Sequence, residues 1–163
     1  MPSIPTWSDL FSDPQNLRRL MRLWPPFAAA GVRIVEVADD WSRIVVELRL
    51  RPWTANFVGT QFGGSLFGMT DPWPMILMMR RLGPDHVVWD KAGEIDFVSP
   101  GRTSVRATFE LTDAMVEEVR DAAADGSKVL RWYPIDVVAP DGTVVARVRK
   151  QLYVRRKRED GRG

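Results

Sequence analysis

The 163-residue chain contains no cysteine and a single histidine, His86. Without cysteine, disulfides and thiolate zinc sites are excluded, and a reducing compartment is compatible, so we expect a cytoplasmic protein. With one histidine, a catalytic triad or a histidine-rich metal centre is not expected, and no metal or cofactor is predicted. The chain also lacks an apolar run of about 20 residues and a basic-then-apolar leader, so neither a membrane span nor a signal peptide is expected.

The formal net charge is small, at +2, and its location matters more than its size. Residues 155–163 carry five basic and two acidic side chains, a net of +3, so the remaining 154 residues carry −1. The basicity therefore belongs to a C-terminal tail (155–163), which we expect to be solvated. No nucleic-acid partner is predicted, and a nucleic-acid or lipid contact through Arg155–Arg158 is the alternative.

The length fits one domain, residues 1–163, with an N-terminal helical extension over about residues 1–30. Ser12 or Asp13 is suited to cap a helix that Pro25-Pro26 would end. Four apolar side chains of this helix share one face: Leu17, Leu20, Met21 and Trp24. This amphipathic pattern predicts a helix that lies against the main body of the protein.

Period-two alternation of apolar and polar residues predicts antiparallel strands with one solvated face. The predicted strands cover residues 43–50, 87–98, 103–111, 129–139 and 144–154. Asp141-Gly142 is a hairpin signal between the last two strands. Residues 112–126 read as a short helix that ends at Gly126.

A long helix is predicted from about Phe62 to Leu82, and it is apolar nearly all round until Arg80-Arg81. Such a helix is expected to be surrounded by protein. Strands with one apolar face can bury that helix by curling around it. The predicted class is therefore α+β, with a curled antiparallel sheet of five or six strands wrapped around a long central helix.

A short motif, Asn56 followed by Phe62-Gly63-Gly64 and then Asp71, resembles that of the PaaI-type hotdog-fold acyl-CoA thioesterases. The segments 88–111 and 142–154 are similar to hotdog proteins related to the YiiD C-terminal domain. The resemblance covers roughly residues 40–155. It implies the hotdog fold, homodimers or dimers of dimers that pair sheets edge to edge, and active sites at the dimer interface.

The same resemblance implies roles for individual residues. The Gly63 N–H would donate to the thioester carbonyl, Asn56 would polarise that carbonyl or position water, and Asp71 would act as general base or nucleophile. Phe62 stands where the family usually has histidine. The residues expected to bind substrate are Thr60, Phe62, Gly64, Ser65 and Met75, and coenzyme A enters only as part of that substrate.

Elementary geometry gives an independent expectation. A glycine at a helix start offers free N–H groups and the positive end of the helix dipole to a developing oxyanion, with no side chain in the way. On one continuous helix, Asp71 would lie about 12 Å along the axis and about 80° around it from Gly63. One carbonyl carbon cannot contact both groups, so two chains are predicted to build each site.

Other interpretations of these residues remain open at this stage. Asp71 before Pro72 also fits the cap of a helix that restarts there, and Gly63-Gly64 and Asn56 also fit turns. The methionines of the predicted helix, Met69, Met75, Met78 and Met79, either line an acyl tunnel or fill the core. Asp90, Glu94 and Asp96 are expected on one strand face, as a metal site or as solvated acids.

The sequence thus predicts hydrolysis of acyl-CoA or acyl-carrier thioesters. Asp71 would activate water, and Gly63 and Asn56 would stabilise the oxyanion. The alternative is a non-catalytic hotdog module that binds acyl-CoA or fatty acid, which Phe62 and the Asp71-Pro72 pair favour. The expected partners are a small-molecule thioester and further copies of the chain.

Overall fold

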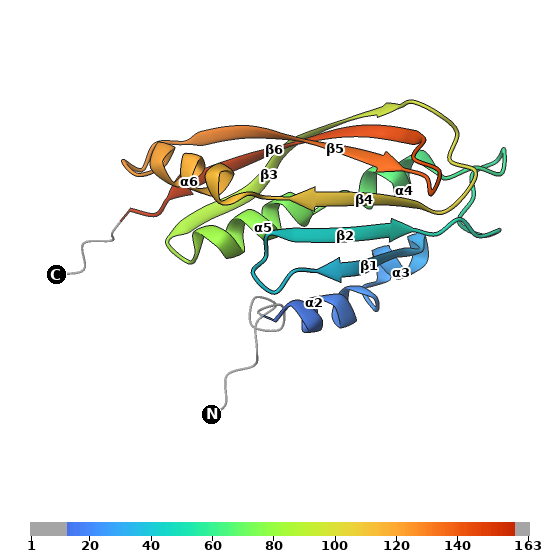
Figure 1. Cartoon of the computed structure of the whole chain (residues 1–163), viewed down its shortest axis with the longest axis horizontal. Coiled ribbons are helices and arrows are strands. Elements are labelled where there is room, and N and C mark those ends of the chain that lie inside the picture. The colour runs from blue at the N-terminus through green and yellow to red at the C-terminus, as the bar shows by residue number, and fades with distance from the viewer. Residues whose placement is uncertain (1–12, 159–163) are drawn as a thin grey trace.

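The computed structural model describes residues 13–158, which form one six-stranded antiparallel sheet and five helices (Figure 1). The strand order is β1-β2-β4-β5-β6-β3. The strands are β1 (Val32–Val37), β2 (Arg43–Leu48), β3 (His86–Phe97), β4 (Val105–Glu110), β5 (Val129–Val138) and β6 (Val144–Arg156). The sheet curls over helix α5 (Trp73–Leu82), which contacts β3, β4 and β6. The predicted α+β class and curled sheet are confirmed.

The prediction of one continuous helix over residues 62–82 is wrong. The segment forms α4 (Gly63–Gly68) and α5, separated by residues 69–72. Pro72 has no N–H to continue the helix and disfavours helical geometry at Asp71. The alternative of a helix that breaks and restarts at Asp71-Pro72 is confirmed, but Asp71 does not cap the second helix, because the N-cap is Pro72 and no side chain caps α5.

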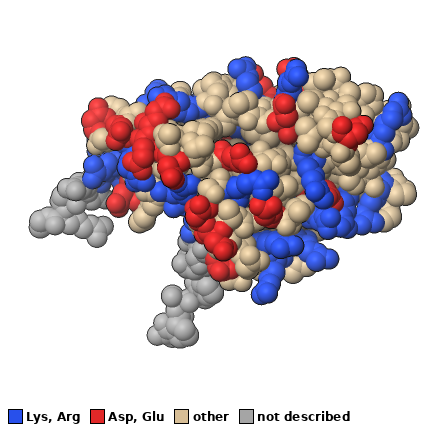
Figure 2. Space-filling view, in the orientation of Figure 1, with Lys and Arg blue, Asp and Glu red and all other residues tan. Residues whose placement is uncertain are grey.

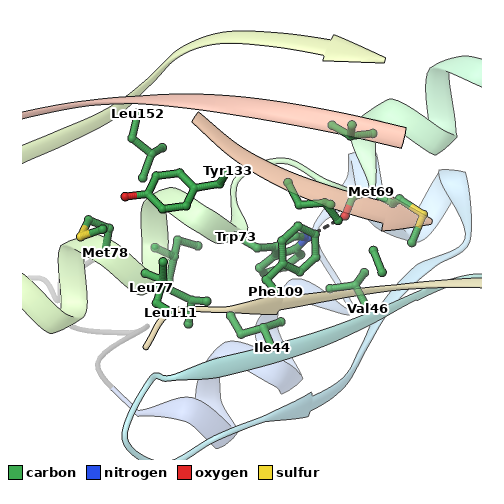
Figure 3. Close-up of a cluster of buried hydrophobic side chains, with 14 of the residues drawn as sticks. Ile44, Val46, Met69, Trp73, Leu77, Met78, Phe109, Leu111, Tyr133 and Leu152 are labelled. Carbon is green, nitrogen blue, oxygen red and sulfur yellow. Dashed lines mark hydrogen bonds between the residues drawn. The ribbon is translucent and has the colours of Figure 1, made fainter. Parts of the chain in front are cut away.

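The core fills the space between α5 and the inner face of the sheet (Figure 3). Trp73 is fully buried, and its indole N–H donates to the Met69 carbonyl at 2.7 Å, which ties the start of α5 to the end of α4. Met69 and Met78 are fully buried, whereas Met75 and Met79 are partly buried against the core. Two of the four methionines are therefore core residues.

The N-terminal region differs from the predicted single helix. Helix α2 (Pro14–Met21) is capped by Asp13, which accepts from the Asn16 N–H at 2.9 Å, as expected. Pro25-Pro26 was expected to end a helix but instead opens α3 (Pro25–Ala30), since proline is tolerated in a first helical turn. Strand β1, which follows α3, was not predicted. Residues 1–12 of the expected extension lie outside the described residues.

The C-terminal half follows the sequence pattern closely. Thr112 caps α6 (Asp113–Ala122) by accepting from the Met115 N–H, and Gly126 adopts a positive φ of 82° after it. Strand β6 continues to Arg156, so the first two residues of the predicted solvated tail belong to the sheet. Residues 159–163 lie outside the described residues. Among residues 13–158, no helix is both long and apolar enough to cross a membrane.

The two edges of the sheet are unlike each other. Strand β1 has six residues, a register shift between Ile34 and Glu36, and helices α2 and α3 beside it. Strand β3 has twelve residues and, within the described chain, pairs only with β6. Two large apolar side chains of β3, Trp89 and Phe97, are 46% and 60% exposed. A long edge strand without such cover exposes unpaired backbone groups and is a template for another strand.

Candidate active site

A pocket of about 490 Å³ opens at the start of α4. We call it the Gly63 pocket. Its walls come from the loop before α4, from α4 itself and from the segment that follows β3. The lining residues include Asn56, Thr60, Gln61, Gly63, Phe97 and Arg102. Three predicted site residues, Asn56, Thr60 and Gly63, are therefore brought together.

The Asn56 amide is fully engaged within its own loop. Its Oδ1 accepts from the N–H groups of Val58 and Thr60 at 3.1 and 3.0 Å. Its Nδ2 donates to Thr60 Oγ1 at 2.8 Å and to the Gln61 carbonyl at 3.3 Å. The interpretation of Asn56 as a turn residue accounts for all four contacts. Its contribution to the pocket is to hold Thr60 and Gln61 in the wall.

Two aromatic rings leave no room for a side chain at Gly63 or at Gly64. A Cβ on Gly63 would lie 2.9 Å from the ring of Phe97, and a Cβ on Gly64 would lie 2.5 Å from the ring of Phe62. The first-turn N–H groups of α4 have no acceptor within the helix, and Phe62 supplies no side-chain cap. Because α4 has only six residues, individual N–H groups matter here more than a helix dipole.

The remaining predicted substrate-binding residues do not line the Gly63 pocket. Phe62 is exposed, as are Phe57 and Val58 of the preceding loop. Gly64 is exposed, Ser65 is half-buried, and Met75 packs partly against the core. The structure thus places Asn56, Thr60 and Gly63 in the pocket wall and the rest of the predicted set outside it.

Asp71 lies apart from the Gly63 pocket, in contact with a buried lysine. Its Oδ1 accepts from Lys150 Nζ at 2.8 Å, and its side chain is 56% exposed. The Lys150 side chain is 7% exposed, and its Nζ also lies 3.4 Å from Asp90 Oδ1. The ring of Phe67 covers the ammonium at 5.7 Å. One buried cation therefore bridges two carboxylates.

Sequence reasoning missed Lys150, although a signal for it exists. Lys150 occupies an inward position of β6, between Val148 and Leu152, and is the one charged residue in that otherwise apolar alternation. Gly93 of β3 pairs with Lys150 and has no side chain to displace it. A Cβ at Gly93 would lie 2.7 Å from the Phe67 ring, so this glycine makes room for the ring over the ammonium.

A bulge in β3 corrects the expectation that Asp90, Glu94 and Asp96 share a face. The register shifts between Asp90 and Ala92, so one extra residue reverses the alternation. Asp90 consequently points inward to Lys150, whereas Glu94 is bonded to Arg149 on the outer face. Within the described residues, no group of three acidic or histidine side chains is placed to hold a metal ion.

Burial shapes the electrostatics of this cluster. It raises the pKa of Asp90 to about 6, the attraction of Lys150 opposes the rise, and the nearby Asp71 adds to it. Below about pH 6 the cluster of Asp71, Asp90 and Lys150 therefore binds one proton more than it does above that pH. The cluster is close to neutral in that form and carries a net charge of −1 above it.

Asp90→Asn is expected to make the protein more stable than wild type at pH 7.5 and to lose that advantage at acidic pH. The folded-state pKa of Asp90 lies above its unfolded value, so the folded state binds more protons between about pH 4 and 6. Stability of the wild type should then fall as pH rises through this window, and the variant should lack this fall. Urea denaturation at pH 4 and 7.5 measures it. Equal pH dependence in both proteins would contradict the assignment.

The Gly63 pocket and the Asp71 cluster are separated along β3. Gly63 lies under Phe97, whereas Asp71 binds Lys150, which pairs with Gly93. Four residues of strand span about 13 Å. The broken helix removes the basis of the helix-derived estimate. The separation along the strand keeps the two-chain site as a prediction.

The chain is similar in fold to several solved structures. A Pseudomonas aeruginosa protein of unknown function, described as a probable thioesterase, shares 15% identity over 87% of this chain and 95% of its own, with a TM-score of 0.75. The Haemophilus influenzae thioesterase shares 15% identity over 91% and 94%, with a TM-score of 0.65. Mouse thioesterase superfamily member 2 shares 19% identity over 86% and 96%, with a TM-score of 0.60.

Sequence comparison gives the family. No curated protein matches the chain significantly. A family model described as a domain of unknown function, DUF4442, matches residues 15–154. Together with the curled sheet around α5, these similarities confirm the predicted hotdog fold. The chain is a member of the DUF4442 family and has the hotdog fold.

Proposed function

We propose that the protein hydrolyses acyl thioesters, carried by coenzyme A or an acyl-carrier protein, at a site shared by two protomers. The observation that carries the proposal is that Gly63 lies beside Phe97, whereas Asp71 binds Lys150 opposite Gly93, and these two positions are about 13 Å apart along the edge strand β3. Proteins of similar fold that are named thioesterases support the reaction class.

Pairing of two β3 strands would join the two parts of the site. If the two strands run antiparallel with their two-fold axis at Ile95, Gly93 of one protomer lies opposite Phe97 of the other. The Asp71 cluster beside Gly93 then faces the Gly63 pocket beside Phe97. This register closes the separation that exists within one protomer, and it does so at both ends of the paired strands.

The proposed hydrolysis uses one hydrogen-bond donor, one carboxylate and one water molecule. The thioester oxygen accepts from the Gly63 N–H, while Asp71 of the second protomer takes a proton from a water molecule that attacks the carbonyl carbon. The tetrahedral intermediate collapses, the carbon–sulfur bond breaks, and the thiolate leaves and takes up a proton. The products are a carboxylic acid and a free thiol.

The other predicted residues have supporting roles in this proposal. Asn56 and Thr60 hold the pocket wall, and Gly64 and Ser65 continue the first turn of α4 with further N–H groups. Phe62 and Met75 offer apolar surface to the acyl chain. Release of free thiol from a panel of acyl-CoA substrates, followed with a thiol reagent, tests the function directly. The protein itself contains no cysteine to interfere.

A second candidate function is binding of acyl-CoA without hydrolysis. It is favoured by the ion pair of Asp71 with Lys150, which occupies one oxygen of the proposed base. It is favoured also by Phe62, an apolar residue at the mouth of the site. Saturable binding of acyl-CoA with no thiol release by the wild-type protein would establish this function instead.

Ile95→Cys is expected to yield a disulfide-linked dimer under mild oxidation. Residues opposite each other on an antiparallel pair have Cα atoms about 4.5 to 5.5 Å apart, within the range that a disulfide spans. Lys128→Cys, in an exposed turn far along the chain from β3, is the control and should stay monomeric on a denaturing gel. A dimer in solution that the Ile95→Cys variant fails to cross-link would place the interface or its register elsewhere.

A further inference from the structure

A second pocket, of about 540 Å³, is lined by six arginines. We call it the arginine pocket. It lies between α2, the end of α3, strand β1 and the segment that follows β2, at the opposite edge of the sheet from β3. Figure 2 shows basic side chains gathered at the lower right, over the N-terminal helices and the end of β2. The six arginines are Arg18, Arg19, Arg22, Arg33, Arg49 and Arg51.

The positive charge of the arginine pocket is only slightly compensated. Arg33 and Arg49 both bind the buried carboxylate of Glu47, at 2.7 and 3.2 Å. Within residues 13–158, the other four arginines form no ion pair with a carboxylate, and no acidic side chain lines the pocket. Six guanidinium groups around one cavity repel one another, and a bound anion would remove that repulsion.

Parts of the pocket are already fixed in place. Glu47 holds the guanidinium groups of Arg33 and Arg49, and it also binds Arg106 at 3.0 Å. On α2, Arg18 and Arg22 are four residues apart and so lie on the same side of the helix. The buried Leu17 and Met21 anchor that helix to the protein. Planar guanidinium groups arranged in this way suit the bidentate binding of phosphate oxygens.

The arginine pocket and the Gly63 pocket lie on either side of one loop. Arg49 and Arg51 begin the segment that ends at Gly63, and both line the arginine pocket. Gln61, in the wall of the Gly63 pocket, donates from Nε2 to the Leu48 carbonyl at 3.2 Å, next to Arg49. Coenzyme A carries its thioester at the end of a long flexible arm and its phosphate groups at the other end. With such a substrate, the thioester would lie in the Gly63 pocket and the phosphate groups in the arginine pocket.

We propose that the arginine pocket binds the phosphate groups of a nucleotide, with the nucleotide end of coenzyme A as its ligand. The identity of the ligand as part of a thioester substrate rests on the proposed function, whereas the phosphate site does not. The concave shape and size suit a small bisphosphate. An acyl-carrier protein would instead present a convex acidic surface and a single phosphate.

The test is calorimetric binding of coenzyme A and of adenosine 3′,5′-bisphosphate to the wild type and to the Arg18→Gln/Arg22→Gln variant. Lys128→Gln/Arg147→Gln is the matched control, because it removes two positive charges from exposed positions outside the pocket. Each lost arginine–phosphate contact is expected to weaken binding about tenfold. The control should bind within about twofold of wild type, apart from a general salt-dependent loss.

Steady-state kinetics distinguish failure of the phosphate site from failure of the proposed function. For acyl-CoA, the arginine variant should raise KM with little change in kcat, while hydrolysis of acyl-pantetheine, which lacks the nucleotide, should be unchanged. If the wild type hydrolyses no thioester but the variant still loses bisphosphate binding, the site stands and free nucleotide is its ligand. Absence of bisphosphate binding by wild type, or equal loss in variant and control, would overturn the site. Tighter binding of a DNA oligonucleotide than of the bisphosphate, lost in the same variant, would overturn it too.

Discussion

Asp71→Asn is expected to lower kcat for thioester hydrolysis by about 10²-fold or more, because the amide cannot take a proton from water. The fold should persist, since Asp71 is half-exposed in a linker and Lys150 keeps Asp90 as a partner. Steady-state kinetics with an acyl-CoA panel measure the effect. Asp121→Asn, on an exposed position of α6, serves as the control and should retain full turnover. Wild-type turnover by the Asp71→Asn protein would refute the mechanism.

Mixing two inactive variants extends this experiment to the shared site. Gly63→Ala places a methyl group against the Phe97 ring and should also impair turnover. In a mixed dimer, the Gly63→Ala chain supplies an intact Asp71 to the intact Gly63 of the Asp71→Asn chain. Co-refolded mixtures should therefore be clearly more active than either parent alone. If the mixture is no more active than its parents, both groups act within one protomer or do not act together.

Lys150→Met is expected to lower stability by about 3 kcal/mol at pH 7.5, the low end for breaking a buried ion pair, because Asp71 is partly solvated. Without the ammonium, Asp90 and Asp71 repel each other, and the pKa of Asp90 should rise further above its present value of about 6. Urea denaturation over a range of pH measures both effects. The fall in stability between pH 4 and 7.5 should be steeper than in wild type.

The double variant Lys150→Met/Asp90→Asn separates charge from packing. Removing the Asp90 charge along with its partner should restore much of the lost stability, and the coupling between the two substitutions should be non-additive. A double variant as unstable as Lys150→Met alone would show that the lysine acts through packing against Phe67 and Gly93 and not through its charge.

Period-two alternation located five of the six strands, because each of these has one face on the core. The grouping of Asn56, Thr60 and Gly63 in one pocket wall was also within reach of the sequence, since these three residues are close neighbours along the chain. One long helix was predicted over α4 and α5 because both are apolar, while Asp71-Pro72 gave the alternative of a break that the structure has. Strand β1 was not predicted, nor was the helix α3 that precedes it.

The Asp71 cluster could not be assembled from sequence alone. Lys150 is the charged residue in an apolar alternation, but its partner Asp71 lies 79 residues away in the linker and its partner Asp90 lies on β3. The inward position of Asp90 depends on a bulge, and a bulge is defined by the register of the partner strand β6. Local pattern therefore assigned Asp90 to the same face as Glu94 and Asp96, which the pairing separates.

The bulge at Lys91 also constrains the number of residues in β3. Before the bulge, the even-numbered residues of β3 face the core. After the bulge, from Gly93 to Phe97, the odd-numbered residues face the core. Removing one residue there would rotate Phe97 away from Gly63 and turn Glu94 and Asp96 toward the core. The number of residues between Asp90 and Phe97 is therefore more tightly constrained than the identity of most side chains among them.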